Sequence, residues 1–423
     1  MTAKNNIPAD YKDSAVGVIP QEWEVKALGE AYKLQGGYAF KSELFADIGI
    51  PIVRISNLPM DSNIVDITDC VYYPNTESIK EQFIIKQGML LIAMSGATTG
   101  KTAVYNNQNS SYLNQRVGMF CSKNDDITYN YLLQLVQSPL YSNALKPLLI
   151  AGAQPNIAPS DVENMKFPVP PMEEQWKIAE ILGVWDEAIE KQSRLIERLE
   201  LRKRALMQRL LTGRTRLPGF STPWQKVKLG EICKRVTRRN EENNQNVMTI
   251  SAQKGFVSQT DFFNKSVASS TLDNYYLVLK DEFCYNKSYS NGYPMGAIKR
   301  LKEADKAVVT TLYICFSIAD SKRLDINFFE QFCENGEFNQ GLMKIANEGG
   351  RAHGLLNVTP TDFFSLVMLL PTLPEQKAIA EVLTTADDEI ATNRKKLDAL
   401  RLQKRGLMQQ LLTGKTRVKF KIL

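Results

Sequence analysis

The chain contains two copies of one segment, 201 residues apart. Residues 170–216 align without a gap on residues 371–417, and 22 of the 47 aligned positions are identical. The same offset relates Trp23 to Trp224, outside the segment itself. Internal repetition at a fixed period constrains an architecture more strongly than a local pattern does. We therefore predict a duplicated unit of about 200 residues with internal pseudo-two-fold symmetry.

The repeated segment has the periodicity of a long helix that pairs along one side. Its apolar residues recur at alternating spacings of four and three, which is the seam of a coiled coil. The predicted seam residues are Ile178, Leu182, Ile189, Ile196, Leu199 and Leu206 in the first copy, and Ile379, Leu383, Ile390, Leu397, Leu400 and Leu407 in the second.

Both seams are polar at the same two positions. Gln192 and Lys203 in the first copy correspond to Asn393 and Lys404 in the second. A polar residue in a coiled-coil seam lowers stability but can fix register and orientation. We predict such a role here; ordinary solvated helix positions are the alternative.

Each copy also carries the end signals of a helix. Proline and glutamate stand at the start, where glutamate complements the helix dipole, and a Thr-Gly pair ends the pattern. The first helix is predicted over residues 174–211 and would be about 57 Å long, too long for one globular core. We expect it to pair with the other copy, antiparallel. Apolar residues off the seam offer a second face for other subunits, and they are Ile181, Leu195, Leu201, Met207 and Leu211.

The segments outside the helices have the pattern of mixed α/β domains. Short strands are predicted at residues 50–55, 89–93, 116–120, 308–316 and 364–370, and short helices at residues 127–136 and 327–335. The predicted fold class is α+β, with two similar α/β domains separated by two long antiparallel coiled-coil helices. The predicted boundaries are residues 1–169 for the first domain, 170–217 for the first helical region, 218–370 for the second domain and 371–423 for the second helical region.

The composition argues against several classes of protein. The chain has a single histidine, so a Ser-His-Asp triad or a His-based metal site is disfavoured and we predict no metal, whereas carboxylate-only mechanisms remain open. Six cysteines without a CxxC pair favour reduced thiols and a cytoplasmic location. No apolar run has the ~18 residues of a membrane span, so we expect no membrane partner. The formal charge of +6 permits a polyanionic partner such as nucleic acid.

Polar clusters in both domains contain the residue types that contact DNA. Asn, Gln and Arg present paired hydrogen-bonding groups to base edges, and Lys and Arg neutralise phosphate. Surface or turn positions are the alternative for each residue taken singly. The candidate DNA contacts are Ser95, Thr98, Lys101, Asn114, Gln115, Arg116, Gln154 and Asn156 in the first domain, and Lys287, Tyr289, Asn291, Lys299, Arg300, Arg351 and His353 in the second.

The sequence of one loop resembles a nucleotide-binding motif. Residues 95–102 match G-x-x-x-x-G-K-[ST] with Ser95 in place of the first glycine, and such loops cradle phosphates on backbone amides. The sister loop around Gly292 and Gly296 has no lysine, and residues 102–105 have the pattern of a strand rather than a helix. We therefore expect no ATP site. A turn that offers Lys101 to a DNA phosphate and a purely structural turn are both left open.

The order of the segments resembles the specificity subunits of type I restriction-modification enzymes. A Glu-Gln-x-x-Ile-Ala motif starts each helix and Leu-Leu-Thr-Gly ends it, and a diverged domain precedes each helix. The resemblance covers essentially the whole chain. It implies two target recognition domains, each reading one half of a bipartite double-stranded DNA target, and helices that set the distance between the half-sites.

The resemblance also implies partners. Two methyltransferase subunits, which bind S-adenosylmethionine, would dock on the chain and methylate adenine. Restriction subunits that use ATP and Mg²⁺ would complete the complex. The chain itself would hold no catalytic residue and bind no cofactor. The alternatives are a coiled-coil scaffold without DNA reading, and a nucleotide-binding enzyme that uses residues 95–102.

Overall fold

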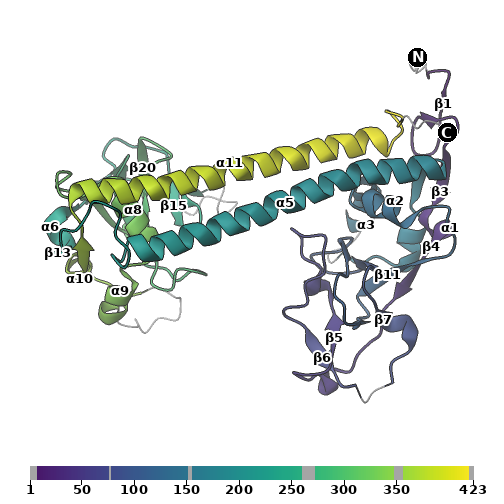
Figure 1. The fold of residues 1–423 in the computed structure, drawn as a ribbon, viewed down its shortest axis with the longest axis horizontal. Helices are drawn as coiled ribbons and strands as arrows, with labels where there is room; N and C mark the ends of the chain where they lie inside the picture. The colour runs from purple at the N-terminus through teal and green to yellow at the C-terminus, as the bar shows by residue number, and fades with distance from the viewer. Residues whose placement is uncertain (1–6, 76–77, 151–154, 260–271, 347–355, 419–423) are drawn as a thin grey trace. The chain divides into compact units, whose positions relative to one another are not determined.

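The computed structural model describes residues 7–75, 78–150, 155–259, 272–346 and 356–418 (Figure 1). Within it the chain divides into two compact units, one formed by residues 1–192 with 396–423 and the other by residues 193–395. The two boundaries between these units lie within long helices, the first in α5 (Met172–Leu210) and the second in α11 (Leu373–Leu411). Each unit therefore combines one strand-rich domain with part of both helices.

The domain of unit 1, called domain 1 below, contains a four-stranded antiparallel sheet of order β4-β11-β8-β9. Strand β8 lies inside this sheet and is buried along its length, as its sequence Leu-Leu-Ile-Ala requires. The strands of this sheet are β4 (Tyr32–Gly36), β8 (Leu90–Ala93), β9 (Thr102–Val104) and β11 (Val117–Ser122). A second sheet has the order β6-β5-β10-β7, in which only β5 and β10 are parallel.

The remaining elements of unit 1 connect these sheets to the helices. Strand β3 pairs with β12 just before α5 begins, and strand β1 pairs with β2. Their bounds are β1 (Tyr11–Lys12), β2 (Ile19–Pro20), β3 (Glu24–Ala27), β5 (Ile50–Val53), β6 (Val71–Tyr73), β7 (Ile84–Ile85), β10 (Ser111–Leu113), β12 (Lys166–Val169), α1 (Leu28–Ala31), α2 (Tyr129–Val136), α3 (Pro139–Ile150) and α4 (Pro159–Glu163), with 3-10 turns η1 (Ser42–Leu44), η2 (Ile55–Asn57) and η3 (Glu81–Phe83).

Unit 2 repeats the first of these sheets in its own domain, domain 2, whereas β15 pairs with β16 and β17 pairs with β20 in place of the second four-stranded sheet. Its four-stranded sheet has the order β14-β21-β18-β19, and β13 pairs with β22 just before α11. The bounds are β13 (Gln225–Lys228), β14 (Cys233–Arg235), β15 (Met248–Ser251), β16 (Gly255–Ser258), β17 (Tyr276–Leu279), β18 (Phe283–Asn286), β19 (Ala297–Arg300), β20 (Lys306–Val309), β21 (Ile314–Ile318), β22 (Val367–Leu370), α6 (Leu229–Ile232), α8 (Ile326–Glu334), α9 (Asn339–Ile345) and α10 (Pro360–Phe364). The matching strand orders confirm the predicted α+β fold and internal repeat.

One predicted strand is wrong. Residues 308–316 were expected to form a single strand, but β20 ends at Val309 and β21 begins at Ile314. The Tyr313 amide donates to the Thr310 carbonyl (3.3 Å), and the Leu312 amide donates to the Thr310 hydroxyl (3.3 Å). This local turn replaces sheet pairing, because a threonine side chain can compete for nearby backbone groups.

The two long helices have 39 residues each and run antiparallel within each unit (Figure 1). In unit 1, Lys404 of α11 forms an ion pair with Asp186 of α5 (2.6 Å). In unit 2, Lys203 of α5 forms the corresponding pair with Asp387 of α11 (2.6 Å). The two lysines of the polar seam positions therefore bind an aspartate of the opposite helix. Among the predicted seam residues the buried ones are Ile178, Leu182, Ile196, Leu199, Ile379, Leu383, Ile390 and Leu397, and the half-buried ones are Ile189, Leu206, Leu400 and Leu407.

The helix ends also belong to the domain cores. Ile178 and Leu182 of α5 pack with the core of domain 1, and Ile379 and Leu383 of α11 pack with that of domain 2. The predicted second face is accordingly smaller than expected. Met207 and Leu211 are buried in the core of unit 2 and Ile181 is half-buried against that of unit 1, whereas Leu195 and Leu201 remain exposed.

Candidate nucleic-acid interface

Six of the candidate contacts lie on loops at equivalent places in the two domains. The β8–β9 loop of domain 1 carries Ser95, Thr98 and Lys101, and the β18–β19 loop of domain 2 carries Lys287, Tyr289 and Asn291. Each loop joins the last two strands of the matching four-stranded sheet. The fold therefore presents two sets of different side chains at the same position of one scaffold.

The β8–β9 loop belongs to a larger group of loops, which we call the domain 1 loop platform (residues 54–57, 94–101, 114–116 and 155–156). Hydrogen bonds within unit 1 hold these segments to one another and to β5. They join Thr98 Oγ1 to the Ile55 carbonyl (3.3 Å), the Met94 amide to the Arg116 carbonyl (2.8 Å), the Gly96 amide to the Pro155 carbonyl (3.2 Å) and the Asn114 amide to the Val53 carbonyl (3.2 Å). Residues distant in sequence thus form one polar surface.

The turn between β10 and β11 presents two exposed side chains on this platform. Asn114 is half-buried, and its side-chain oxygen accepts from the Arg116 amide (3.2 Å). Gln115 and Arg116 are exposed. An Asx turn of this kind orders the backbone while leaving the two side chains free to reach a ligand.

The near-nucleotide motif does not form a phosphate cradle. A strand, β9, follows Lys101 instead of a helix. The loop's amides are already engaged: those of Thr99, Gly100 and Lys101 donate to Gly96, Ala93 and Thr98 carbonyls at 2.7–3.1 Å. A phosphate-binding loop needs its amides directed at the ligand. This arrangement argues against an ATP site.

The two candidate lysines of the equivalent loops share a partly buried environment. Lys101 donates to the side-chain oxygen of Asn63 (3.0 Å), and burial lowers the pKa of Lys101. Burial also lowers the pKa of Lys287. A neighbouring phosphate would favour the charged form of either lysine, so both are suited to bind an anion.

Two other candidates in domain 2 are engaged within the domain. Lys299 is buried, contacts the ring of Tyr293 and forms an ion pair with Glu334. Arg300 has a largely buried side chain that binds Asp281 and Glu330. Withdrawing either cation from its carboxylate would leave a charge without a partner. We therefore leave Lys299 and Arg300 out of the proposed interface.

The remaining candidates divide by position. Asn156 is exposed and forms a backbone bridge with half-buried Ser95. Tyr289 and Asn291 are exposed on the domain 2 loop, and the Asn291 carbonyl accepts from the Gln253 side chain (3.1 Å). The candidates that lie outside the described residues are Gln154, Arg351 and His353.

The Glu-Gln motif of each helix has a structural role that the sequence analysis missed. Glu174 is fully buried and accepts from the indole N–H of Trp23 (2.9 Å). It also binds Arg417 through two hydrogen bonds (2.9 and 3.0 Å), which raise the pKa of that guanidinium. Unit 2 repeats the cluster with Glu375, Trp224 and Arg216. The dipole role predicted for these glutamates is therefore secondary to a buried charge cluster.

The arginines in these clusters are exchanged between the two copies. Arg417 follows α11 but binds the glutamate that begins α5, and Arg216 follows α5 but binds the glutamate that begins α11. The neighbouring glutamine joins the helix to its domain: Gln175 accepts from the Thr128 amide at the start of α2 (2.8 Å). The motif therefore positions the domain on the helix.

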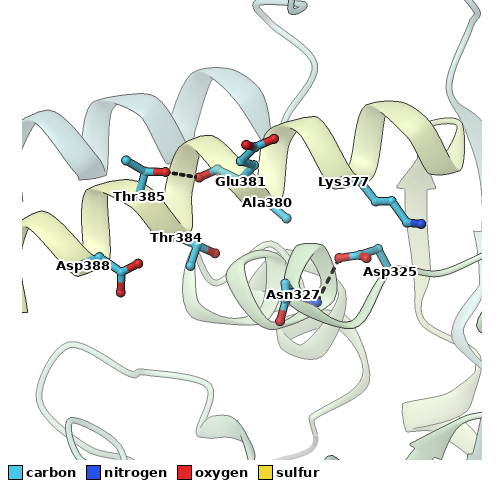
Figure 2. Close-up of a pocket in the computed structure, with 8 residues that line it drawn as sticks. All are labelled: Asp325, Asn327, Lys377, Ala380, Glu381, Thr384, Thr385 and Asp388. Atoms are coloured by element: carbon cyan, nitrogen blue, oxygen red, sulfur yellow. Dashed lines mark hydrogen bonds between the residues drawn. The ribbon is translucent and has the colours of Figure 1, made fainter.

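A polar groove in unit 2 has no catalytic arrangement (Figure 2). It lies between the start of α8 and one face of α11. Asp325, which immediately precedes α8, caps that helix and accepts from the Asn327 and Phe328 amides (3.0 and 2.9 Å). Among the described residues no group of three or more His, Cys, Asp or Glu is arranged to hold a metal ion. Within the same part of the chain, no helix is both long and apolar enough to cross a membrane.

Several known proteins are similar to this chain in sequence or in fold. The model of the type I restriction modification DNA specificity domain matches residues 20–201. The type I restriction enzyme MjaVIII specificity subunit of Methanocaldococcus jannaschii is 31% identical over 222 residues, which is 50% of each chain. A relative named as the MjaX specificity subunit, from the same organism, is 28% identical over 97% of each chain.

Solved structures agree on the fold. The type I restriction-modification S subunit from M. genitalium has a TM-score of 0.53 and 13% identity, and the match covers 97% of this chain and 98% of that one. A chain from a structural study of complex assembly in a type I restriction-modification system has a TM-score of 0.56 and 15% identity, covering 94% and 99%.

The class of protein that these findings indicate is a DNA-specificity protein. Residues 20–201 match the type I restriction modification DNA specificity domain, and the chain is similar over 97% of its length to a type I restriction enzyme specificity subunit. Such subunits are non-catalytic parts of a larger complex.

Proposed function

We propose that this chain reads a bipartite DNA sequence with one half-site for each domain, and that its helices recruit two copies of a methyltransferase. The observation that carries the proposal is one strand topology used twice with different loop residues. Lys101 and Lys287 stand on equivalent loops, whereas Asn114–Arg116 corresponds to a turn that contains Thr310 and Leu312. Shared scaffolds with unlike contact residues suit two unlike half-sites.

The repeat within the helices supports two identical partners. Most positions that are identical between α5 and α11 are buried or half-buried, as shared packing requires. Three exposed positions on one helical face are also identical, and they are Leu201, Arg204 and Gln208 in α5 and Leu402, Arg405 and Gln409 in α11. Packing within the chain does not require these identities, whereas binding the same partner twice does.

The proposal divides the chemistry among the subunits. The methyltransferases bind S-adenosylmethionine and methylate adenine, and restriction subunits use ATP and Mg²⁺. This chain supplies sequence reading and geometry and binds none of these cofactors. Its affinity for DNA depends largely on phosphate contacts and therefore falls as salt rises.

Exchange of domain 1 tests the reading function. Replacing residues 1–169 by the corresponding domain of another specificity subunit should change one half of the methylated motif and leave the other half unchanged, because each domain reads alone. Sequencing of methylated adenines in cells that carry the chimera and its partner subunits measures this. The matched control is exchange of residues 218–370, which should change only the other half. A motif left intact by both exchanges would contradict the proposal.

A double variant tests recruitment by the repeated helical face. Leu201→Asp combined with Leu402→Asp should weaken methyltransferase binding about tenfold or more, because two exposed apolar contacts of a proposed interface become charged. Analytical ultracentrifugation of the mixed subunits measures the change. Val184→Asp is the matched control, since Val184 is equally exposed (63%) but corresponds to Thr385 in the second copy. Equal effects of the control and the double variant would exclude this face.

A further inference from the structure

Arg54 was absent from the sequence-based candidates, yet it lies on the domain 1 loop platform. It follows strand β5 and begins the turn η2. The Asn114 amide binds the carbonyl of the preceding residue, Val53 (3.2 Å), and Thr98 binds that of the following residue, Ile55 (3.3 Å). The Arg54 backbone is thus flanked by two segments that carry candidate DNA contacts.

The backbone of Arg54 is held firmly. Its amide donates to the side-chain oxygen of Asn57 (2.9 Å), and its carbonyl accepts from the Asn57 amide (2.9 Å). Asn57 is buried (3% exposed), and its side-chain nitrogen donates to the Asp66 carbonyl (2.9 Å). A side chain on such a rigid backbone is preorganised, which reduces the conformational entropy lost on binding.

The guanidinium of Arg54, in contrast, has no hydrogen-bond or ion-pair partner among the described residues. Its Nε is buried without a partner, and so is the hydroxyl of Ser95 on the same platform. A buried donor left unsatisfied costs about 1–3 kcal/mol. Buried polar groups in folded proteins are nearly always paired, so an exception calls for an explanation such as a ligand. Lys299 and Arg300 of domain 2 show the usual outcome, because both are paired with carboxylates.

We propose that Arg54 is a specificity-determining residue of domain 1 that binds a guanine edge in the half-site of that domain. The inference rests on the proposed function. Arginine donates two hydrogen bonds to the O6 and N7 atoms of guanine, the commonest specific contact in the major groove. A half-buried arginine on a fixed backbone suits a base edge, because its planar guanidinium presents donors in a rigid geometry.

The test compares Arg54→Lys with the wild-type chain, each assembled with its methyltransferase. Binding to a library of duplexes randomised across the recognised motif is read by sequencing. In the variant, discrimination at one guanine position of one half-site should fall about 10- to 100-fold, because lysine keeps the charge but loses the two-bond geometry. The other half-site and the salt dependence of binding should not change.

A measurement of stability distinguishes base recognition by Arg54 from a role of Arg54 in stabilising the fold. Arg54→Met should leave the unfolding midpoint of the free chain unchanged or slightly higher, because it removes an unsatisfied buried donor. A lowered midpoint, or a uniform loss of affinity at all positions in Arg54→Lys, would overturn the inference. If the wild-type complex shows no bipartite preference, the proposed function fails; if it shows one that Arg54→Lys leaves intact, only the role of Arg54 fails.

Discussion

Replacing Glu174 with alanine is expected to lower the free energy of unfolding by about 3 kcal/mol. Removing one member of a buried ion pair typically costs about 3–5 kcal/mol, and water at the partly exposed Arg417 places this case at the lower end. The change leaves the indole N–H of fully buried Trp23 without its acceptor and Arg417 without its carboxylate. Urea unfolding followed by tryptophan fluorescence measures the loss.

The adjacent residue provides a matched control. Glu173 is exposed, and the second copy has Pro374 in its place, so Glu173→Ala should change stability by less than about 0.5 kcal/mol. Replacing both partners, Glu174→Leu with Arg417→Met, should recover part of the loss, since apolar residues of similar volume often substitute for a buried pair. Equal stability of Glu173→Ala and Glu174→Ala would contradict the assigned cluster.

Replacing Leu199 with aspartate is expected to lower the free energy of unfolding by at least as much as Glu174→Ala does. Leu199 lies in the α5 seam and is 8% exposed. It does not belong to the hydrophobic core of domain 1 or of domain 2 into which the helix ends pack. An aspartate there would bury a charge with no assigned partner, at a cost of several kcal/mol. We expect a lower unfolding midpoint and a larger hydrodynamic radius as the pairing of α5 with α11 loosens. Circular dichroism with heating and small-angle X-ray scattering measure the two effects.

Leu201→Asp is the control for this change, because it makes the same substitution two residues further along α5. Leu201 is 58% exposed, so the variant should fold with an unchanged midpoint. Since Leu201 also lies on the proposed docking face, its loss of methyltransferase binding should occur without loss of stability. If Leu199→Asp folds as stably as Leu201→Asp, the seam is assigned incorrectly.

Much of the architecture could be predicted because its signals are local. The helix predicted over residues 174–211 is found at Met172–Leu210, since an apolar period of 3.5 residues and end signals act within a few turns. The broken strand at residues 308–316 was missed for a physical reason. Its Thr-rich sequence has β propensity, but a turn held by Thr310 competes with sheet pairing.

The candidate interface was predicted less completely. Residue type directed attention to the β8–β9 and β18–β19 loops, which occupy equivalent places in the two four-stranded sheets. It did not separate Lys299 and Arg300 from Arg116. The carboxylates that engage the first two include Glu334 and Glu330, which lie on α8, about 30 residues away.

The duplication, the two long helices and their seams can all be predicted without the structure, because periodicity and internal repetition need no knowledge of distant contacts. Tertiary structure alone decided which charges are paired. Arg417 meets Glu174 across 243 residues only because the helices run antiparallel, so that the end of each copy reaches the start of the other. It also decided that Arg54, an ordinary residue in the sequence, has a buried donor with no partner in the part of the chain that the structure describes. Electrostatic pairing depends on distances in space, and those are fixed only when the chain has folded.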